Sequence, residues 1–395
     1  MLGCRFDLPL IYSMHFNAWV FSKKNRNLSI LWQLVKQSLH MNKKSIEVWR
    51  QNLALSRPYT IAYHTTTEVE NAFILIELEN GMRGIGAACP MDYVTGETLE
   101  HTLAVLQSEP IKMLEGKPIE RFQLYIKWFR DTFAKYPAAL AAFDMALHDA
   151  FCQTIGLSIV DFLGRRIKKM ATSVTIGIKD VEGTLADAQE FVDGGFKILK
   201  VKLGQDLQMD IERLVKLRER FGYKIGIRVD PNQGYSYRDL LLFDALTESL
   251  QIELVEQPIK VADMSITSGL PADMRDQIAA DESLLDARSA HKLLVPERSC
   301  GIFNIKLMKC GGIQGAQEIA NVAHSAGIDL MWGCNDESIV SITAALHVAF
   351  AQPHTKYIDL DGSFDLAQDV VNGGFVLEDG FMWPSDKPGL GLELI

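Results

Sequence analysis

The sequence predicts an α/β protein built around a parallel β-barrel. After Arg166, eight short apolar runs recur, and the segments between most of them carry apolar residues at helical spacing, as in "DIERLVKLRERFG" and "IQGAQEIANVAHSAG". Strands that alternate with helices form right-handed βαβ units and a parallel sheet. Eight units fit a (β/α)8 barrel, although an open doubly wound sheet would show the same local alternation.

Each strand candidate is a short apolar run of the kind found in buried parallel strands. The candidates lie at residues 173–178, 197–203, 225–230, 251–256, 277–281, 301–307, 327–333 and 357–361. Five consecutive runs carry a polar residue at or next to their C-terminal end. In a barrel these five side chains would converge on the mouth formed by the C-terminal strand ends.

The segment before the barrel, residues 41–165, is predicted to form a smaller α+β domain. Residues 45–86 are strand-rich, and Glu79, Asn80 and Gly81 resemble a hairpin turn. Residues 97–163 turn helical, because "AALAAFDMALHDAFCQTIGLSIVDFLG" places its apolar residues at helical spacing and ends near glycines.

Residues 1–40 are predicted to be a non-native or dispensable extension. The run "LPLIYSMHFNAWVF" is apolar, but its positive charges follow it, whereas a secretory signal places them before the apolar core. Asp7 and the brevity of the run also argue against a membrane span. The sequence "MNKKSIEVWRQNLAL" from Met41 onward reads as the start of an ordinary domain.

Composition excludes several classes of function. The net charge of -10 argues against nucleic-acid binding through a general basic surface. The six cysteines have neither zinc-site nor disulfide-framework spacing, which indicates a reduced, cytoplasmic setting without membrane attachment. The expected partner is therefore a small molecule, and a homo-oligomer is compatible with the sequence.

Three of the strand-end residues are carboxylates. Asp230, Glu256 and Asp281 follow one another at intervals of 26 and 25 residues, close to one βα unit each. A set of oxygen ligands on adjacent strands suits Mg²⁺, and a divalent cation would offset the repulsion among the carboxylates. The alternative for each single residue is a turn or a helix N-cap.

Lysines flank the three carboxylates. In "KILKVKL", Lys200 and Lys202 point to the same face of one strand, and Lys306 ends the strand "FNIKL" on the far side of the carboxylates. With a substrate carboxylate on Mg²⁺, Lys202 and Lys306 could move a proton at opposite faces of its α-carbon, while Lys200 stabilises the enediolate charge. This pattern predicts racemisation or epimerisation by 1,1-proton transfer. The alternative is a structural salt bridge from each lysine to a carboxylate.

The motifs "KVKLG", "RVDPNQGY", "ELVEQP", "AADES" and "NIKLMKCGG" resemble the muconate-lactonizing subgroup of the enolase superfamily. The resemblance spans about residues 45–390 and includes "TGE" at 95–97 in the capping segment. It implies a modified (β/α)7β barrel, residues 166–366, which lacks the helix after the eighth strand. It also implies an α+β capping domain, residues 41–165, completed by residues 367–395.

Within this subgroup the chain resembles the dipeptide epimerases, through "DLDG" near the last strand. The resemblance implies that Asp359 and Asp361 bind the α-ammonium group of a dipeptide whose C-terminal residue is epimerised through an enediolate. It further implies Asp230, Glu256 and Asp281 as Mg²⁺ ligands and Lys202 and Lys306 as the two bases. Substrate contacts are implied for Thr175, Lys200, Cys334 and His64.

Specificity and reaction type each have alternatives at this stage. His64, with Arg57 nearby, stands where members of the resembled family that act on Ala-Glu carry an arginine. Asp336 could favour a polar or cationic side chain or serve as a helix N-cap, and a hydrophobic dipeptide is a further alternative. A cycloisomerase or an o-succinylbenzoate synthase on the same scaffold is the alternative reaction, but their substrates carry no amine for the Asp pair. An N-acylamino acid racemase is a further alternative, and a non-catalytic metal-binding protein is disfavoured by the two lysines.

Overall fold

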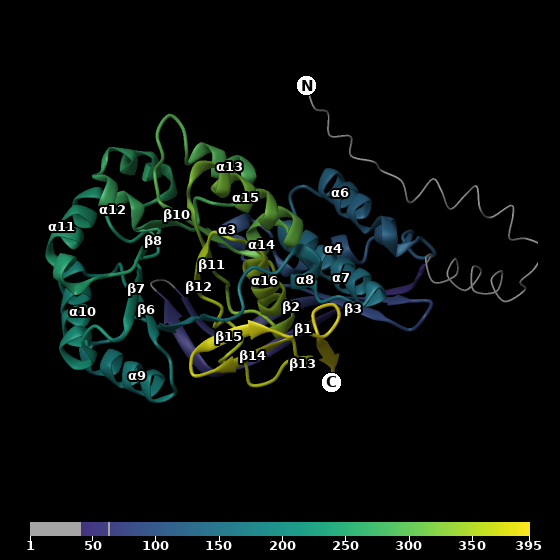
Figure 1. The fold of residues 1–395 in the computed structure, drawn as a ribbon, viewed down its shortest axis with the longest axis horizontal. Coiled ribbons are helices and arrows are strands. Elements are labelled where there is room, and N and C mark those ends of the chain that lie inside the picture. The colour runs from purple at the N-terminus through teal and green to yellow at the C-terminus, as the bar shows by residue number, and fades with distance from the viewer. Residues whose placement is uncertain (1–40, 62–63) are drawn as a thin grey trace, which may run out of the picture.

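The computed structural model describes residues 41–61 and 64–395 (Figure 1), so the predicted extension, residues 1–40, lies outside the described residues. The predicted barrel is confirmed: eight strands form one sheet in the order β12-β11-β10-β9-β8-β7-β6-β5, and the pairs are parallel. Seven of the eight strand candidates contain a strand, and the eighth, residues 357–361, overlaps the last two residues of β12. The bounds are β5 Ser173–Ile176, β6 Ile198–Lys202, β7 Gly226–Asp230, β8 Val255–Glu256, β9 Ile278–Ala280, β10 Ile302–Ile305, β11 Asp329–Trp332 and β12 Thr355–Ile358.

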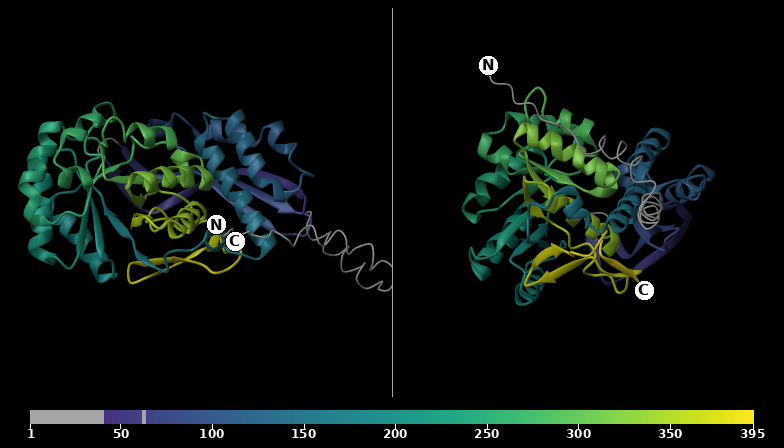
Figure 2. Two further views of the ribbon diagram at one scale, coloured as in Figure 1. Left: turned by 45° about the horizontal axis from the view of Figure 1, so that its top comes forward. Right: turned by 45° about the vertical axis from the view of Figure 1, so that its right-hand side comes forward.

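Helices cover the outside of the barrel between successive strands. Their bounds are α9 Val181–Asp193, α10 Leu207–Phe221, α11 Tyr237–Thr247, α12 Ala272–Asp276, α13 Ala287–Lys292, α14 Leu307–Cys310, α15 Ile313–Ala326 and α16 Ile339–Ala351, with a 3-10 helix at Val261–Gly269. Figure 2 shows these helices around the barrel strands at one end of the molecule. The connections between strands return the chain from the C-terminal end of one strand to the N-terminal end of the next, so all eight C-terminal strand ends meet on one side.

Closure of the barrel takes place between its first and last strands. Thr172 and Ile358 form a parallel bridge, and the hydroxyl of Thr172 accepts a hydrogen bond from the backbone N–H of Leu360 at 3.1 Å. In the described part of the chain no helix follows β12. The prediction of eight complete βα units was therefore wrong for the last unit, which lacks its helix. The family resemblance had implied this (β/α)7β arrangement.

Short strands occupy the C-terminal segment instead of an eighth helix. Their bounds are β13 Val371–Gly373, β14 Phe375–Glu378, β15 Phe381–Pro384 and β16 Leu392–Leu394. β13 pairs with β16, while β14 and β15 form a sheet with β4, Met170–Ala171, just before the barrel. Leu390 also donates its backbone N–H to Asp149 at 2.7 Å. The segment thus joins the start of the barrel to the N-terminal part of the chain.

The N-terminal part is an antiparallel sheet covered by helices. The bounds are β1 Lys43–Ile61, β2 His64–Leu78, β3 Arg83–Ala88, α3 Asp92–Thr95, α4 Leu99–Leu106, α5 Glu109–Lys112, α6 Phe122–Thr132, α7 Pro137–Ile155 and α8 Ile159–Leu163. The predicted hairpin at residues 79–81 is confirmed, since it joins β2 to β3. Gly86 of β3 lies so close to α7 that a Cβ there would stand 1.8 Å from the carbonyl oxygen of Ala142. This glycine lets the sheet pack directly on the helix backbone.

Two buried carboxylates fix the ends of helices near the barrel. Glu97 accepts hydrogen bonds from the backbone N–H groups of Ala138, at 2.7 Å, and Ala139, at 3.0 Å, at the start of α7. Asp144 of α7 accepts from Ile313 and Gln314 at the start of α15. Both carboxylates satisfy helix N–H groups that lack intrahelical partners. They hold α7 in a fixed position against the barrel.

His347 of α16 should make the stability of the fold depend on pH. Burial lowers the pKa of this histidine to about 3, helped by the nearby Arg165, and its Nδ1 accepts a hydrogen bond from Val160 N–H at 3.0 Å. The unfolded chain takes up a proton near pH 6.5, but the folded chain does so only near pH 3. The free energy of unfolding should therefore fall as the pH drops through this window, by up to about 1.4 kcal/mol per pH unit.

Urea unfolding of the wild type and of His347→Asn measures this contribution. Asparagine keeps an acceptor for Val160 but does not titrate. The wild-type advantage in unfolding free energy should be full well above pH 6.5 and should shrink by about 2.7 kcal/mol near pH 4.5. An advantage that stays constant across this range would show that His347 is not the titrating group.

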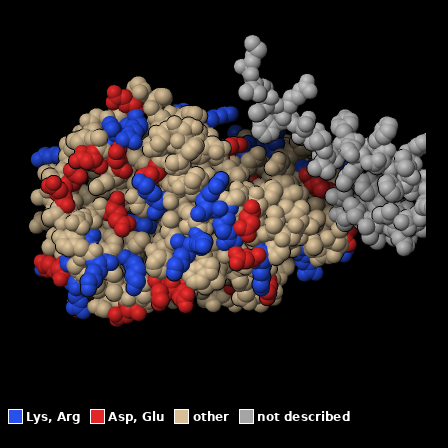
Figure 3. All heavy atoms as spheres, viewed as in Figure 1, with Lys and Arg blue, Asp and Glu red and all other residues tan. Residues whose placement is uncertain are grey.

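The visible surface carries charges of both signs. Figure 3 shows lysine and arginine side chains interspersed with aspartate and glutamate on this face. Among the described helices, none combines the length and the apolar character that a bilayer crossing requires.

Candidate active site

A cavity of about 520 Å³ opens at the C-terminal ends of the barrel strands. Its walls come from the barrel, from α3 of the N-terminal part and from the loop that follows β12. Most of the predicted site residues lie in its walls: Thr175, Lys200, Lys202, Asp281, Lys306, Cys334, Asp359 and Asp361. The barrel mouth is therefore where the predicted chemistry would take place.

Lys200 lies at the centre of a buried charge network. Its Nζ is 2.7 Å from Asp359 Oδ2, 2.7 Å from Glu256 Oε2 and 3.4 Å from Asp230 Oδ2. Burial alone would lower the pKa of this lysine, but the three carboxylates raise it well above its usual value. Lys200 is thus a fixed positive charge between the two groups of predicted carboxylates.

Lys202 and Lys306 each contact a different carboxylate. Lys202 Nζ lies 2.6 Å from Asp230 Oδ2 and 3.1 Å from Asn232 Oδ1, while Lys306 Nζ lies 2.8 Å from Asp281 Oδ2. The strands that carry them, β6 and β10, are separated in the sheet by β7, β8 and β9. The carboxylates raise the pKa of Lys306 well above its usual value against the effect of burial. In this arrangement the carboxylates therefore favour the charged form of Lys306.

The three predicted metal ligands are buried at the ends of adjacent strands. Burial and repulsion from Asp230 raise the pKa of Glu256 to about 8. Burial acts the same way on Asp230 and Asp281, but the neighbouring lysines hold their pKa values below the usual range. In the described ranges, no three His, Cys, Asp or Glu side chains are arranged to hold one metal ion, because these carboxylates point toward lysines.

The donor set nevertheless fits Mg²⁺ chemically. All three side chains offer oxygen, they come from neighbouring strands, and Lys200 contacts two of them. Burial, together with repulsion from Asp230 and Asp281, disfavours the charged form of Glu256. A divalent cation would relieve that repulsion. Their role as ligands stays a prediction.

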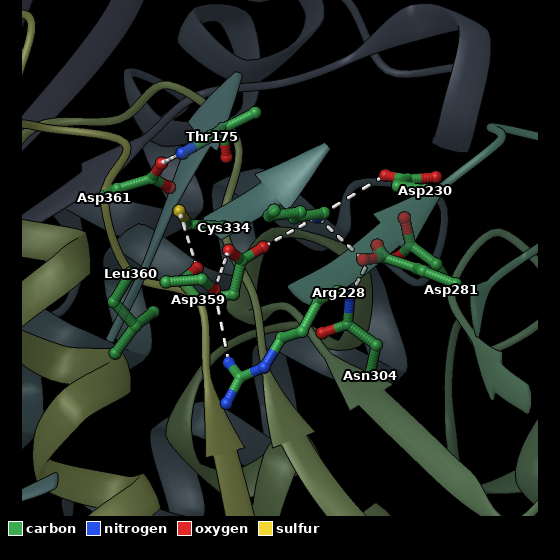
Figure 4. A network of polar contacts seen from close by, with 12 residues as sticks. Thr175, Arg228, Asp230, Asp281, Asn304, Cys334, Asp359, Leu360 and Asp361 are labelled. Carbon is green, nitrogen blue, oxygen red and sulfur yellow. Dashed lines mark hydrogen bonds and ion pairs between the residues drawn. The ribbon is translucent and has the colours of Figure 1, made fainter. Parts of the chain in front are cut away.

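The predicted ammonium-binding pair lies on the other side of the mouth. Asp359 accepts a hydrogen bond from Ser173 Oγ at 2.6 Å, and Asp361 accepts one from the backbone N–H of Thr175 at 2.7 Å. Cys334 lies beside them, with its Sγ 3.3 Å from the carbonyl oxygen of Asp359. Figure 4 shows Thr175 and Asp361 on one side of the barrel mouth and Asp230 and Asp281 on the other.

Burial and Asp359 together raise the pKa of Asp361 to about 7. By contrast, Lys200 and Ser173 hold the pKa of Asp359 below its usual value, although burial opposes them. Two carboxylates so close together attract a cation, and an ammonium group of a substrate could supply it.

His64 is the predicted contact that cannot be placed. Residue 64 begins β2 opposite Ile61, but its side chain lies outside the described residues. Its contact with a substrate therefore stays a prediction.

Sequence reasoning missed several buried residues that support the site. Arg228 lies beneath the mouth and donates to the carbonyl oxygen of Ile358 at 2.7 Å and to Ser173 at 3.2 Å (Figure 4). Asn304 donates to Glu256 at 2.8 Å. Both precede a predicted site residue by two positions, so strand alternation could have placed them on the inner face. Lys309, which contacts Asp281 from the short helix α14, had no such signal.

Two family models match the chain. The model of the mandelate racemase / muconate lactonizing enzyme N-terminal domain matches residues 43–164, and the enolase C-terminal domain-like model matches residues 183–395. Together they cover most of the described chain.

Similar proteins include epimerases of dipeptides. The L-Lys-D/L-Arg epimerase of Desulforapulum autotrophicum is 51% identical over 355 residues, which span 90% of this chain and all of that protein. The L-Lys-D/L-Arg epimerase of Methylococcus capsulatus is 49% identical over 88% of this chain and 98% of its own length. A crystal structure of a dipeptide epimerase from Methylococcus capsulatus, complexed with Mg and the dipeptide L-Arg-D-Lys, superposes with a TM-score of 0.87. It is 48% identical and covers 89% of this chain and 99% of its own.

Proposed function

Because this chain belongs to the mandelate racemase / muconate lactonizing enzyme family of the enolase superfamily and is a dipeptide epimerase, we propose that its substrates are dipeptides with cationic side chains. The C-terminal residue of the dipeptide would be the one that is inverted. L-Lys-L-Arg and its relatives are the compounds that we expect to react fastest.

The excess of acidic side chains in the cavity walls is the observation that supports this proposal most directly. Seven carboxylates line the cavity, compared with four lysines. Four of the seven belong neither to the predicted metal set nor to the predicted ammonium pair: Glu190, Glu282, Asp336 and Asp365. A cavity with such an excess of negative charge attracts cationic side chains and repels acidic ones. The similar proteins that act on Lys and Arg support the same choice.

Mg²⁺ is the cofactor of the proposed reaction, as in the related crystal structure that contains Mg. Asp230, Glu256 and Asp281 would hold it, and when bound it supplies positive charge that stabilises the enediolate form of the substrate carboxylate. Asn304 keeps Glu256 oriented through its 2.8 Å hydrogen bond. Lys200 adds a second fixed positive charge close to the same carboxylates.

Proton transfer would be divided between two lysines. Lys202 from β6 and Lys306 from β10 approach the cavity from strands separated by three others, so each would face one side of the substrate α-carbon. One lysine removes the α-proton and the other returns a proton to the opposite face. Asp359 and Asp361 hold the ammonium group, which fixes the dipeptide so that its C-terminal residue lies between the lysines.

Deuterium incorporation tests the proposed function directly. The protein would be incubated with Mg²⁺ in D2O and with L-Lys-L-Arg, L-Ala-L-Glu, L-Leu-L-Tyr or N-succinyl-L-Arg. Mass spectrometry should show a one-unit gain that is fastest for L-Lys-L-Arg and is lost when a chelator removes the metal. Faster exchange of L-Ala-L-Glu would contradict the cationic preference, and faster exchange of N-succinyl-L-Arg would favour the acylamino acid racemase alternative.

The buried Asp pair argues against the cycloisomerase alternative. Substrates of that class offer no amine, so Asp359 and Asp361 would have no ammonium group to bind. We also propose a cytoplasmic location, which is supported by the five cysteines in the described ranges, all of them free thiols. Assembly into a homo-oligomer stays a prediction.

A further inference from the structure

The cavity does not end at the ammonium-binding pair. It continues between α9 and the loop after β12, in the seam where the barrel has no eighth helix. We call this extension the α9 arm and define it by Glu190, Phe191, Phe196, Phe364 and Asp365. We infer that the α9 arm binds the side chain of the N-terminal residue of the substrate and selects a long cationic side chain, Lys or Arg. The inference rests on the proposed function.

Both walls of the α9 arm start at residues predicted to contact the substrate. Thr175 of β5 leads directly into α9, which carries Glu190 and Phe191. Asp361 begins a turn closed by a 2.9 Å hydrogen bond from Phe364 N–H, and Asp365 follows. With the substrate ammonium group held at Asp359 and Asp361, the side chain of the N-terminal residue of the dipeptide would lie next to the α9 arm. The C-terminal residue lies toward β7, β8 and β9 instead.

A strip of three aromatic rings lines the α9 arm. The ring centroids of Phe191 and Phe196 are 6.2 Å apart, and those of Phe196 and Phe364 are 5.9 Å apart. All three side chains are half-buried. The aliphatic stem of lysine or arginine packs well on such a surface, and its cation is attracted to aromatic faces.

Phe196 of the α9 arm is held by a tight backbone contact. A Cβ on Gly380, in the turn between β14 and β15, would lie 2.8 Å from Phe196 Cα, and this glycine has a φ of 76°. Only glycine fits both the contact and the backbone angle without strain. The turn therefore fixes Phe196 in position.

The carboxylates of the α9 arm lie on its exposed rim. Glu190 and Asp365 are both exposed to solvent while the rings behind them are half-buried. This arrangement matches the two ends of a lysine or arginine side chain, an apolar stem and a charged head that stays near water. A shorter alanine side chain would reach neither the rings nor the carboxylates.

A double variant, Glu190→Gln with Asp365→Asn, tests the inference on the full-length protein with Mg²⁺. The readout is the selectivity ratio, kcat/KM for L-Lys-L-Arg divided by kcat/KM for L-Ala-L-Arg. In the wild type this ratio should exceed one and should fall as salt is added, because exposed charges are screened. In the double variant the ratio should fall roughly tenfold, mainly through KM for L-Lys-L-Arg.

Glu182→Gln is the matched control, since Glu182 is an exposed carboxylate on the same helix that does not line the cavity. The inference is overturned if the ratio is unchanged in the double variant, or if it falls equally in the control. A wild-type enzyme that epimerises both dipeptides with equal kcat/KM would overturn the inference but not the proposed function. Absence of deuterium incorporation into any dipeptide would overturn both.

Discussion

Replacing Lys306 by alanine is expected to abolish epimerisation while leaving α-proton exchange in one stereoisomer of the substrate. Lys202 would still reach one face of the α-carbon, so a substrate with its proton on that face can exchange it with solvent. Inversion needs both faces, and the loss of one proton donor or acceptor costs about 10²- to 10⁴-fold in rate. Lys202→Ala should show the same loss with exchange in the opposite stereoisomer.

The measurement is deuterium incorporation into L-Lys-L-Arg and L-Lys-D-Arg, followed separately for each variant. Lys216→Ala, an exposed lysine of α10 paired with Glu219, is the control and should behave as wild type. Exchange in the same stereoisomer for both variants would contradict the assignment of one lysine to each face. Epimerisation by either variant at the wild-type rate would contradict the two-base mechanism.

Removing the charge of Asp361 should weaken binding of substrates with a free amine. Asparagine at this position can still accept the 2.7 Å hydrogen bond from Thr175 N–H, so the loop should keep its shape. The expected loss is about 2 to 3 kcal/mol, or roughly a hundredfold in kcat/KM, because a buried ammonium group loses a charged partner. The effect should appear in kcat/KM for L-Lys-L-Arg measured by polarimetry.

An acetylated substrate separates charge from shape in this experiment. N-acetyl-L-Lys-L-Arg has no α-ammonium group, so the wild type should process it poorly and Asp361→Asn should lose little further activity on it. The wild type and Asp361→Asn, each measured with the free and the acetylated dipeptide, form a thermodynamic cycle. Its coupling energy reports the contact between Asp361 and the amine. A coupling energy near zero would mean that the amine is bound elsewhere.

The strand-end residues of the site were predictable because closure of a barrel brings residues at regular sequence intervals to the same end of the sheet. Once Lys202, Asp230, Glu256, Asp281 and Lys306 fall one βα unit apart, closure of the sheet brings them to one mouth. Their roles as ligands and bases are still predictions. Arg228 and Asn304 carried the same signal, since they precede Asp230 and Lys306 by two positions on the inner face.

Other features depend on contacts that no local pattern encodes. Lys309 reaches Asp281 from a four-residue helix, α14, whose direction is set by packing. Glu190 and Asp365 are far apart in sequence and share the α9 arm only because the last strand closes beside the first. The missing eighth helix was also invisible to the alternation, because the last strand candidate looks like the others. For these features the fold had to be known first.

The open seam beside β12 has a consequence for how enzymes of this architecture can diversify. The groups predicted to move protons lie at the end of β6 and directly after β10. The α9 arm is instead built from a surface helix and from the loop after β12, a strand that no helix follows among the described residues. Substitutions in the arm would therefore alter which peptide is accepted without disturbing the buried charge network around Lys200. In a barrel without the eighth helix, substitutions beside β12 could therefore change the substrate specificity during evolution while the residues that carry out the reaction stay the same.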